Sequence, residues 1–256
     1  MQIPFSLAGR TVLIAGASSG LGAHFAQLFS AAGANVVLGA RRMERVTDLA
    51  ASIESSGGTA LAVPLDVTDE QSVIAANDIA EARFGCVDSI VANAGVSVSG
   101  RSTDIPIDGL QKVINTNILG VYLVAREGAK RLIAKDSRSK ENGRITIIGS
   151  ITSRMTGEGD SAYAATKAGA THLGRNLARE WVRQGVNVNT VHPGYIATEI
   201  QGDWFQTEGG KAQIDGFHRR RLQEVSSLDA MMLYFSSDAS KSVTGSDIIV
   251  DDGQSL

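Results

Sequence analysis

The stretch TVLIAGASSGLG at residues 11–22 joins a short apolar run to a turn that is rich in glycine. The run TVLIA is apolar almost throughout, which predicts a strand that is buried on both faces of a sheet. The glycines Gly16, Gly20 and Gly22 permit a tight turn and a close approach of the backbone to a ligand. A helix that begins at Gly20 would direct its free N–H groups at a phosphate. A purely structural turn is the alternative, but a position after the first strand of an α/β series favours nucleotide binding.

The alternation of short apolar runs with longer amphipathic stretches continues along the chain. It predicts further strands at 35–40, 59–65, 89–95, 144–149, 186–191 and 246–253. It predicts helices at about 20–32, 43–55, 69–84, 108–135 and 161–184, with Thr68 as the N-cap of the third. Strands that are apolar on both faces imply a parallel sheet with helices on both sides. The expected fold is therefore α/β, a doubly wound Rossmann fold with a seven-stranded parallel sheet.

The chain of 256 residues suits a single large domain, 1–256. One segment, 201–222, follows the sixth strand and fits no strand–helix unit. We interpret it as a small substrate-binding lobe within that domain.

The composition excludes several classes of partner. The net charge of −3 gives no reason to expect nucleic acid. One cysteine, Cys86, rules out an intrachain disulfide and fits a reducing cytoplasm. The four histidines share no ligand spacing, so no metal site is predicted. The first residues do not resemble a signal peptide, and no apolar run would span a membrane, so we expect a cytoplasmic protein without membrane contacts.

The end of the second strand indicates which dinucleotide would bind. In dinucleotide folds an acidic residue at this point binds the ribose hydroxyls. Here the strand ends in Gly39-Ala40, and Arg41 and Arg42 follow. Guanidinium groups suit a 2′-phosphate, so NADP(H) is favoured over NAD(H), which stays open. The alternative is a pair of solvated arginines at the start of a helix.

The segment SAYAATKAG at 161–169 places Tyr163 and Lys167 four residues apart, on one face of a helix. A phenol has an ordinary pKa near 10, and a nearby ammonium group stabilises the phenolate. Tyr163 would then donate a proton to a carbonyl oxygen or remove one from an alcohol. Taken alone, the pair is also what an ordinary amphipathic helix with a stray tyrosine and lysine would show.

With these features the chain resembles the classical short-chain dehydrogenase/reductase family over nearly its whole length. Residues 15–22 resemble the family's T-G-x-x-x-G-x-G motif, with Ala15 in place of the threonine. LDV at 65–67 is similar to its adenine-contacting element, and ANAG at 92–95 to its N-N-A-G motif, with Ala92 as a departure.

Three further segments strengthen the resemblance. NTNILG at 115–120 contains the family's asparagine, Asn117. Ser150 lies thirteen residues before Tyr163, which is the family's usual spacing. HPGYIATE at 192–199 resembles the turn that meets the nicotinamide.

The resemblance implies four catalytic residues. Tyr163 would be the general acid/base, and Lys167 would lower its pKa and bind the nicotinamide ribose. Ser150 would hydrogen-bond the substrate oxygen, and Asn117 would hold a water in a proton relay to the lysine.

The resemblance and the two arginines also imply the lining of the cofactor and substrate sites. The expected cofactor residues are Gly16, Ser18, Ser19, Gly20, Leu21, Gly22, Arg41, Arg42, Asp66, Val67, Asn93, Ala94, Gly95, Tyr163, Lys167, Pro193, Gly194, Ile196 and Thr198. The expected substrate residues are Val96, Ser97, Ile151, Met155, Glu158, Tyr195, Trp204 and Phe205. Trp204, Phe205 and Phe217 suit either an apolar pocket or the core of the lobe.

The function expected is therefore reversible hydride transfer between NADPH and a small carbonyl compound or secondary alcohol. A 3-oxoacyl-[acyl-carrier-protein] reductase is an alternative that needs a basic entrance, for which Arg101, Lys130, Arg131 and Arg154 are candidates. A sugar or steroid dehydrogenase, or a non-catalytic NADP-binding sensor, are further alternatives. The family resemblance implies a homotetramer, a dimer of dimers. The basic run Arg219–Arg221 suits a solvated face or a subunit contact better than an acidic ligand.

Overall fold

The protein is described here from a computed structural model that covers residues 5–256. Its strands form one parallel sheet in the order β3-β2-β1-β4-β5-β6-β7. The strands are β1 Thr11–Ala15, β2 Asn35–Ala40, β3 Thr59–Pro64, β4 Ser89–Ala92, β5 Gly143–Ile148, β6 Val186–Pro193 and β7 Asp247–Val250. The strand order reverses between β1 and β4, so the chain leaves a crevice at the carboxyl ends of these two strands. The doubly wound, seven-stranded parallel sheet predicted from the sequence is confirmed.

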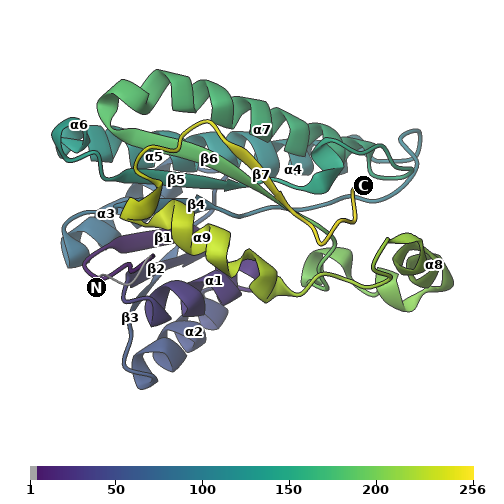
Figure 1. Cartoon of the computed structure of the whole chain (residues 1–256), viewed down its shortest axis with the longest axis horizontal. Helices are drawn as coiled ribbons and strands as arrows, with labels where there is room; N and C mark the ends of the chain where they lie inside the picture. Colours follow the sequence, from purple (N-terminus) through teal and green to yellow (C-terminus); the bar gives the residue numbers. More distant parts are fainter. Residues whose placement is uncertain (1–4) are drawn as a thin grey trace.

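Helices cover both faces of the sheet, as strands buried on both faces require (Figure 1). They are α1 Gly20–Ala31, α2 Met43–Ser55, α3 Glu70–Phe84, α4 Ile107–Ile114, α5 Val121–Ala134, α6 Ser137–Lys140, α7 Ser161–Trp181, α8 Glu208–Gly216 and α9 Asp229–Ser236. Alternate side chains of β1 divide between two cores. Leu13 packs with residues of α3, α5 and α7, whereas Ile14 packs with residues of α1, α2 and α9.

Several element ends differ from the sequence predictions. The N-cap of α3 is Asp69, whose carboxylate accepts the Gln71 N–H at 2.9 Å, and not Thr68. The Thr68 hydroxyl instead donates to the Asp66 carboxylate at 2.7 Å, so it is not available as a cap. Strand β4 ends at Ala92 and not at residue 95, since the chain then turns along the crevice. Strand β3 ends at Pro64 and β7 spans only 247–250, whereas β6 runs on to Pro193.

The single helix predicted at 108–135 is interrupted. A π-helical turn, Asn115–Gly120, separates α4 from α5. Such turns hold one more residue than an α-helical turn and are frequent at functional sites. Here the turn carries Asn117, which is fully buried and faces the loop after β4. At Gly120 a Cβ atom would lie 2.6 Å from the Val67 side chain, so glycine permits close packing on the end of β3.

The segment 201–222 contains α8 and projects beside the sheet (Figure 1). Tyr195, which precedes it, stacks on Phe217 with ring centroids 5.6 Å apart and meets the edge of Phe205 at 6.0 Å. These aromatic contacts attach the projection to the turn after β6. No helix of residues 5–256 is both long enough and apolar enough to cross a membrane.

Candidate active site

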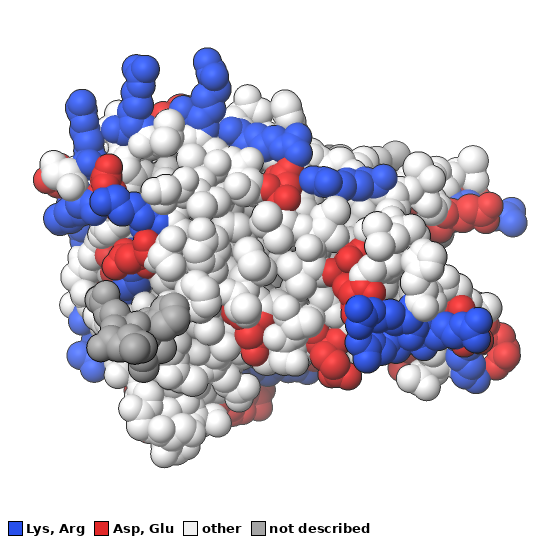
Figure 2. All heavy atoms as spheres, viewed as in Figure 1, with Lys and Arg blue, Asp and Glu red and all other residues white. Residues whose placement is uncertain are grey.

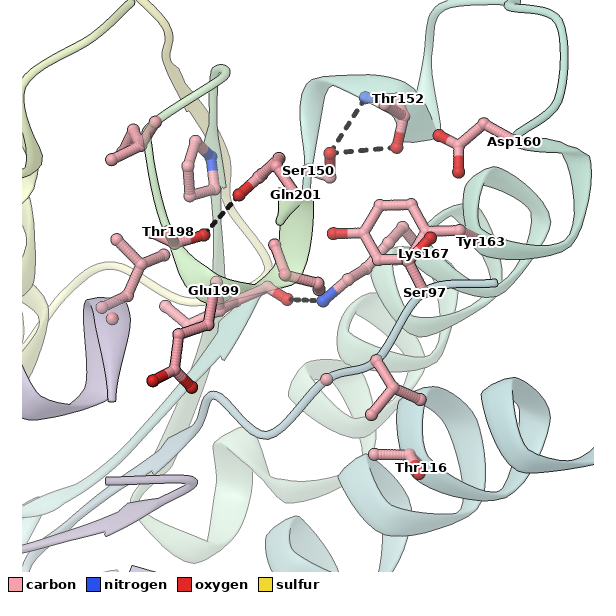
Figure 3. Close-up of a pocket in the computed structure, with 18 of the residues that line it drawn as sticks. Ser97, Thr116, Ser150, Thr152, Asp160, Tyr163, Lys167, Thr198, Glu199 and Gln201 are labelled. Carbon is pink, nitrogen blue, oxygen red and sulfur yellow. Dashed lines mark hydrogen bonds between the residues drawn. The ribbon is translucent and has the colours of Figure 1, made fainter. Parts of the chain in front are cut away.

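A cavity of about 830 Å³ opens at the carboxyl ends of the strands, where the strand order reverses. Its wall comprises the glycine turn after β1, the loops after β2 to β5, the start of α7 and the turn after β6 (Figure 3). Every cofactor and substrate residue predicted from the sequence lines this cavity, except Gly22. Of the four predicted catalytic residues, Ser150, Tyr163 and Lys167 line it, and Asn117 lies behind the wall.

One wall of the cavity is formed by the glycine turn, where backbone atoms of Gly16 and Gly20 face the cavity. Gly16 and Gly20 have φ angles of +87° and +54°, a region that favours glycine. A Cβ at Gly16 would lie 2.8 Å from the Ala94 Cα, and a Cβ at Gly22 would overlap the Gly16 carbonyl oxygen. The Asn93 amide donates to that same oxygen at 2.9 Å. Strand ends β1 and β4 therefore meet backbone to backbone, and the cradle that they form with the start of α1 fits a pyrophosphate.

The two arginines after β2 have different surroundings. Arg42 donates to the hydroxyls of Ser18 and Ser19 at 2.7–3.1 Å and to the Glu199 carboxylate at 2.9 Å. Arg45 binds the other oxygen of Glu199, and the two guanidiniums and the Ser19 hydroxyl lower the pKa of Glu199 to about 2. Arg41 lines the same end of the cavity and has no ion-pair partner within residues 5–256. A 2′-phosphate would thus meet one free guanidinium and one that is already paired.

The phenol of Tyr163 faces the cavity, and Lys167 lies beside it, with Nζ 5.5 Å from the ring centroid. Nζ donates to the Ile148 carbonyl at 2.8 Å, and burial lowers the pKa of Lys167 to about 8. Burial also raises the pKa of Tyr163, and the Ser150 hydroxyl opposes this only in part. The lowered phenol pKa expected from the Tyr–Lys pair is therefore not produced by these residues alone, because desolvation is the larger effect.

The hydroxyl of Ser150 is oriented by its neighbours. Its oxygen accepts from the backbone N–H and the hydroxyl of Thr152, at 3.2 and 2.9 Å. With both of these donors on its oxygen, the Ser150 O–H is left to donate toward the cavity.

His192 supports the same loop from behind. It is fully buried, its Nδ1 lies 2.9 Å from the Ser150 carbonyl oxygen, and burial lowers the pKa of its ring. A Cβ at Gly149 would lie 2.6 Å from this nitrogen, so the histidine packs directly against the backbone that carries Ser150. The neutral His192 ring therefore supports the backbone of the site by packing and does not line the cavity.

Asn117 fixes the loop after β4. Its side-chain oxygen accepts the Val96 N–H at 3.0 Å, and its amide donates to the Val96 carbonyl at 2.9 Å and to the Thr166 hydroxyl at 3.1 Å. All the amide's hydrogens and one oxygen lone pair are therefore used inside the protein. The residue links the fourth strand's loop to α7 and so to Tyr163 and Lys167.

The lobe contributes to the wall and also has its own core. Trp204 and Phe205 line the cavity, whereas Phe217 does not and stacks on Tyr195 instead. The basic run at 219–221 lies outside the cavity wall, and both Arg219 and Arg221 pair with Asp252.

The functional residues that sequence reasoning missed include Thr152, Asp160, Glu199 and Gln213. Thr152 orients Ser150, Glu199 pairs with Arg42 and Arg45, and Asp160 and Gln213 line the cavity. The available signal for Asp160 was its position as an acidic residue directly before the helix that carries Tyr163. Glu199 meets its partners only in the folded chain, so no local pattern indicates that pairing. No group of three or more His, Cys, Asp or Glu within the described part of the chain is arranged to hold a metal.

The doubly wound sheet, with a cavity where its strand order reverses, is the architecture of dinucleotide-binding enzymes. The family model for short chain dehydrogenase matches residues 10–209, and the chain belongs to the short-chain dehydrogenase/reductase family. It is accordingly an oxidoreductase of the group that acts on hydroxyl groups of small molecules.

Three similar proteins can be aligned with this chain over 98% of its length. A 3beta-hydroxysteroid dehydrogenase 1 of Eggerthella lenta is 34% identical over 98% of this chain and 95% of its own length. A 2,5-dichloro-2,5-cyclohexadiene-1,4-diol dehydrogenase of Sphingobium indicum is 32% identical and covers 98% of each chain. The crystal structure of a gluconate 5-dehydrogenase from Burkholderia cenocepacia, in complex with NADP and tartrate, superposes with a TM-score of 0.92 at 30% identity, over 98% of this chain and 97% of that one.

Proposed function

We propose that the protein transfers a hydride reversibly between NADPH and a small carbonyl compound or secondary alcohol. The convergence of Ser150, Tyr163 and Lys167 on one cavity, next to a backbone cradle for pyrophosphate, carries this proposal. The lobe at 201–222 would close over the substrate, since Trp204 and Phe205 already form part of the wall.

In this mechanism the bound nicotinamide supplies or accepts the hydride, and its oxidised form adds a positive charge near the phenol. The Ser150 O–H donates to the substrate oxygen and holds it beside Tyr163. Tyr163 then gives a proton to that oxygen in reduction or takes it away in oxidation. Lys167, whose Nζ lies 5.5 Å from the Tyr163 ring centroid, stabilises the phenolate and would bind the nicotinamide ribose. Asn117 keeps the loop after β4 and α7 together, and by family resemblance it would hold the water of a proton relay.

The proposed cofactor is NADP(H), with NAD(H) as the weaker ligand. Arg41 is free to bind a 2′-phosphate, and Ser18 and Ser19 hold Arg42 beside the pyrophosphate cradle. NADP in the Burkholderia cenocepacia gluconate 5-dehydrogenase supports the same assignment by similarity.

Replacing Glu199 with glutamine is expected to tighten NADP+ binding about fivefold and to change NAD+ binding little. The Glu199 carboxylate repels a 2′-phosphate and competes with it for Arg42, and an exposed ion pair is worth up to about 1 kcal/mol. Fluorescence titrations of both cofactors at one salt concentration measure the change. Glu54→Gln, an exposed carboxylate at the far end of α2, is the matched control. Equal shifts for the two cofactors would contradict the role of Glu199.

The carrier-protein alternative is not supported by the four basic residues that were candidates for its entrance. None of Arg101, Lys130, Arg131 and Arg154 lines the cavity, and Arg131 is bound by Asp78, Glu81 and Glu127. The names of the relatives favour instead a cyclic alcohol or a polyol, since they include a steroid, a cyclohexadienediol and a gluconate dehydrogenase.

We also propose a homotetramer. Apolar side chains are exposed along α4, the π-helical turn and α5, namely Ile114, Leu119, Tyr122 and Ile133. Strand β7 is an edge of the sheet, and Figure 2 shows a broad uncharged area on the face that carries β7 and α9. A monomer mass by light scattering would refute this assembly. The cytoplasmic location stays a prediction, which cell fractionation tests.

The function is tested by following NADPH absorbance with cyclic and open-chain ketones, aldehydes, polyol-derived ketones and acetoacetyl thioesters, with NADH in parallel. Turnover with NADPH well above that with NADH is expected. A preference for NADH would refute the role of Arg41 and leave the role of Tyr163 standing.

A further inference from the structure

The two ends of the cavity carry different charged groups. Among the described lining residues, Arg41 and Arg42 lie at the nucleotide end together with the carboxylates of Asp66 and Glu199. Around the catalytic hydroxyls the charged side chains on the wall are Glu158, Asp160 and Lys167, and Lys167 is buried and bonded to the Ile148 carbonyl. The space open to a substrate therefore has acidic walls.

Asp160 directly precedes α7, where an aspartate ordinarily caps the helix. Its carboxylate makes no cap bond, and it has no hydrogen-bond or ion-pair partner within residues 5–256. The backbone around it is nevertheless fixed, because its carbonyl accepts the Ala164 N–H at 2.9 Å and the Gly159 carbonyl accepts the Gly100 N–H at 3.0 Å. The side chain is half-buried, and burial raises its pKa to about 6. Such an acceptor is costly to the fold unless something binds to it.

Asp160 also lies close to the reacting group. It stands three residues before Tyr163, on the same side of the start of α7. Figure 3 shows its carboxylate beside Thr152 and Tyr163, on the cavity side of the helix. Burial is the main cause of the raised pKa of Tyr163 and Tyr195, and the charge of Asp160 adds to it, as expected for a group that shares their surroundings. A molecule whose oxygen is held by Ser150 and Tyr163 would therefore share this part of the wall with the Asp160 carboxylate.

We propose that Asp160 binds a hydrogen-bond donor of the substrate, so that the enzyme prefers alcohols that carry a second hydroxyl or an ammonium group and disfavours those that carry a carboxylate. This inference rests on the proposed oxidoreductase function and specifies its substrate class. An ionised carboxylate accepts strong hydrogen bonds from either donor and repels an anion.

Four compounds with one ring separate the alternatives: cyclohexanol, cyclohexane-1,2-diol, 2-aminocyclohexanol and 2-hydroxycyclohexanecarboxylate. Binding to the NADP+ complex is measured by saturation-transfer NMR, and turnover by absorbance, at pH 5 and pH 8. The diol or the amino alcohol is expected to bind about tenfold more tightly than cyclohexanol at pH 8, and the carboxylate more weakly than cyclohexanol. These differences shrink at pH 5, where Asp160 is protonated.

The Asp160→Asn variant is expected to reduce the preference to about twofold and to remove its dependence on pH, whereas Asp48→Asn, at an exposed carboxylate on α2 outside the cavity wall, preserves both. Folding of the variant is checked by its melting temperature. The pKa of Asp160 is raised in the folded state, so the native protein loses stability as pH rises from about 4 to 6. The asparagine variant therefore melts at a higher temperature than the native protein at pH 8, with the difference vanishing below pH 4.

Tighter binding of the carboxylate than of the diol, binding of none of the four compounds, or an unchanged preference in Asp160→Asn would overturn the assignment. If neither NADP+ nor NAD+ binds and no compound is turned over, the proposed function itself fails. Cofactor binding with no effect of Asp160→Asn removes only the substrate assignment.

Discussion

Replacing Tyr163 with phenylalanine is expected to lower kcat roughly a thousandfold, which is within the range of general acid–base catalysis. The phenylalanine ring keeps the packing of the tyrosine and the contact with Lys167, whose Nζ lies 5.5 Å from the ring centroid. Only the proton donor is lost, so NADP(H) should bind with unchanged affinity. Steady-state kinetics with the best substrate, together with a fluorescence titration of NADPH, measure the two quantities separately.

Tyr122→Phe is the matched control, since this tyrosine is exposed on α5 and outside the cavity wall. It should keep full activity. An active Tyr163→Phe variant would mean that another group transfers the proton. If the native protein binds NADPH but turns over no substrate, the sensor alternative is favoured.

The second large effect is expected at Gly22. A Cβ there would overlap the Gly16 carbonyl oxygen and lie 2.7 Å from the Asn93 amide nitrogen. Both neighbours are fixed by the hydrogen bond between them, at 2.9 Å, and cannot move without opening the join between β1 and β4. Gly22→Ala should destabilise the protein by about 3 kcal/mol, the upper part of the range for overpacking. The melting temperature should fall by roughly 6–12 °C, and affinity for NADP(H) should fall with it because the cradle is displaced.

Gly216→Ala is the control, because a Cβ at Gly216 would meet nothing within 4 Å. A Gly22→Ala protein with native stability and cofactor affinity would show that the turn can widen. The cradle would then not depend on direct backbone contact.

Much of the fold could be predicted because its signals are local. Strand 35–40 and helix 43–55 have the predicted bounds, since an apolar run and a 3.6-residue period determine each of them. The N-cap of α3 was predicted wrongly because Thr68 and Asp69 are both good caps. The choice depends on Asp66, which binds the Thr68 hydroxyl and leaves Asp69 to cap the helix.

Every predicted cofactor and substrate residue except Gly22 lines the cavity, because most of these residues belong to short segments that directly follow strands. The pairing of Glu199 with Arg42 and Arg45 was not predicted, since these residues lie more than 150 positions apart and meet only in the folded chain. The raised pKa of Tyr163 could not be predicted from the sequence either. The spacing of Tyr163 and Lys167 shows that they share a face, but the desolvation that raises the pKa of the phenol depends on everything packed around it.

The π-helical turn at 115–120 makes the site sensitive to chain length as well as to composition. The turn holds one residue more than an α-helix needs, and each residue advances an α-helix by about 100°. Deleting any one residue of the turn would let α4 and α5 join as one regular helix, although every remaining residue would be unchanged. The side chain at the position of Asn117 would then point about 100° away from Val96 and Thr166. One of the two helices would also turn a different face toward the sheet. At this point in the chain an added residue, and not a substituted one, is what aligns the helix with the catalytic groups.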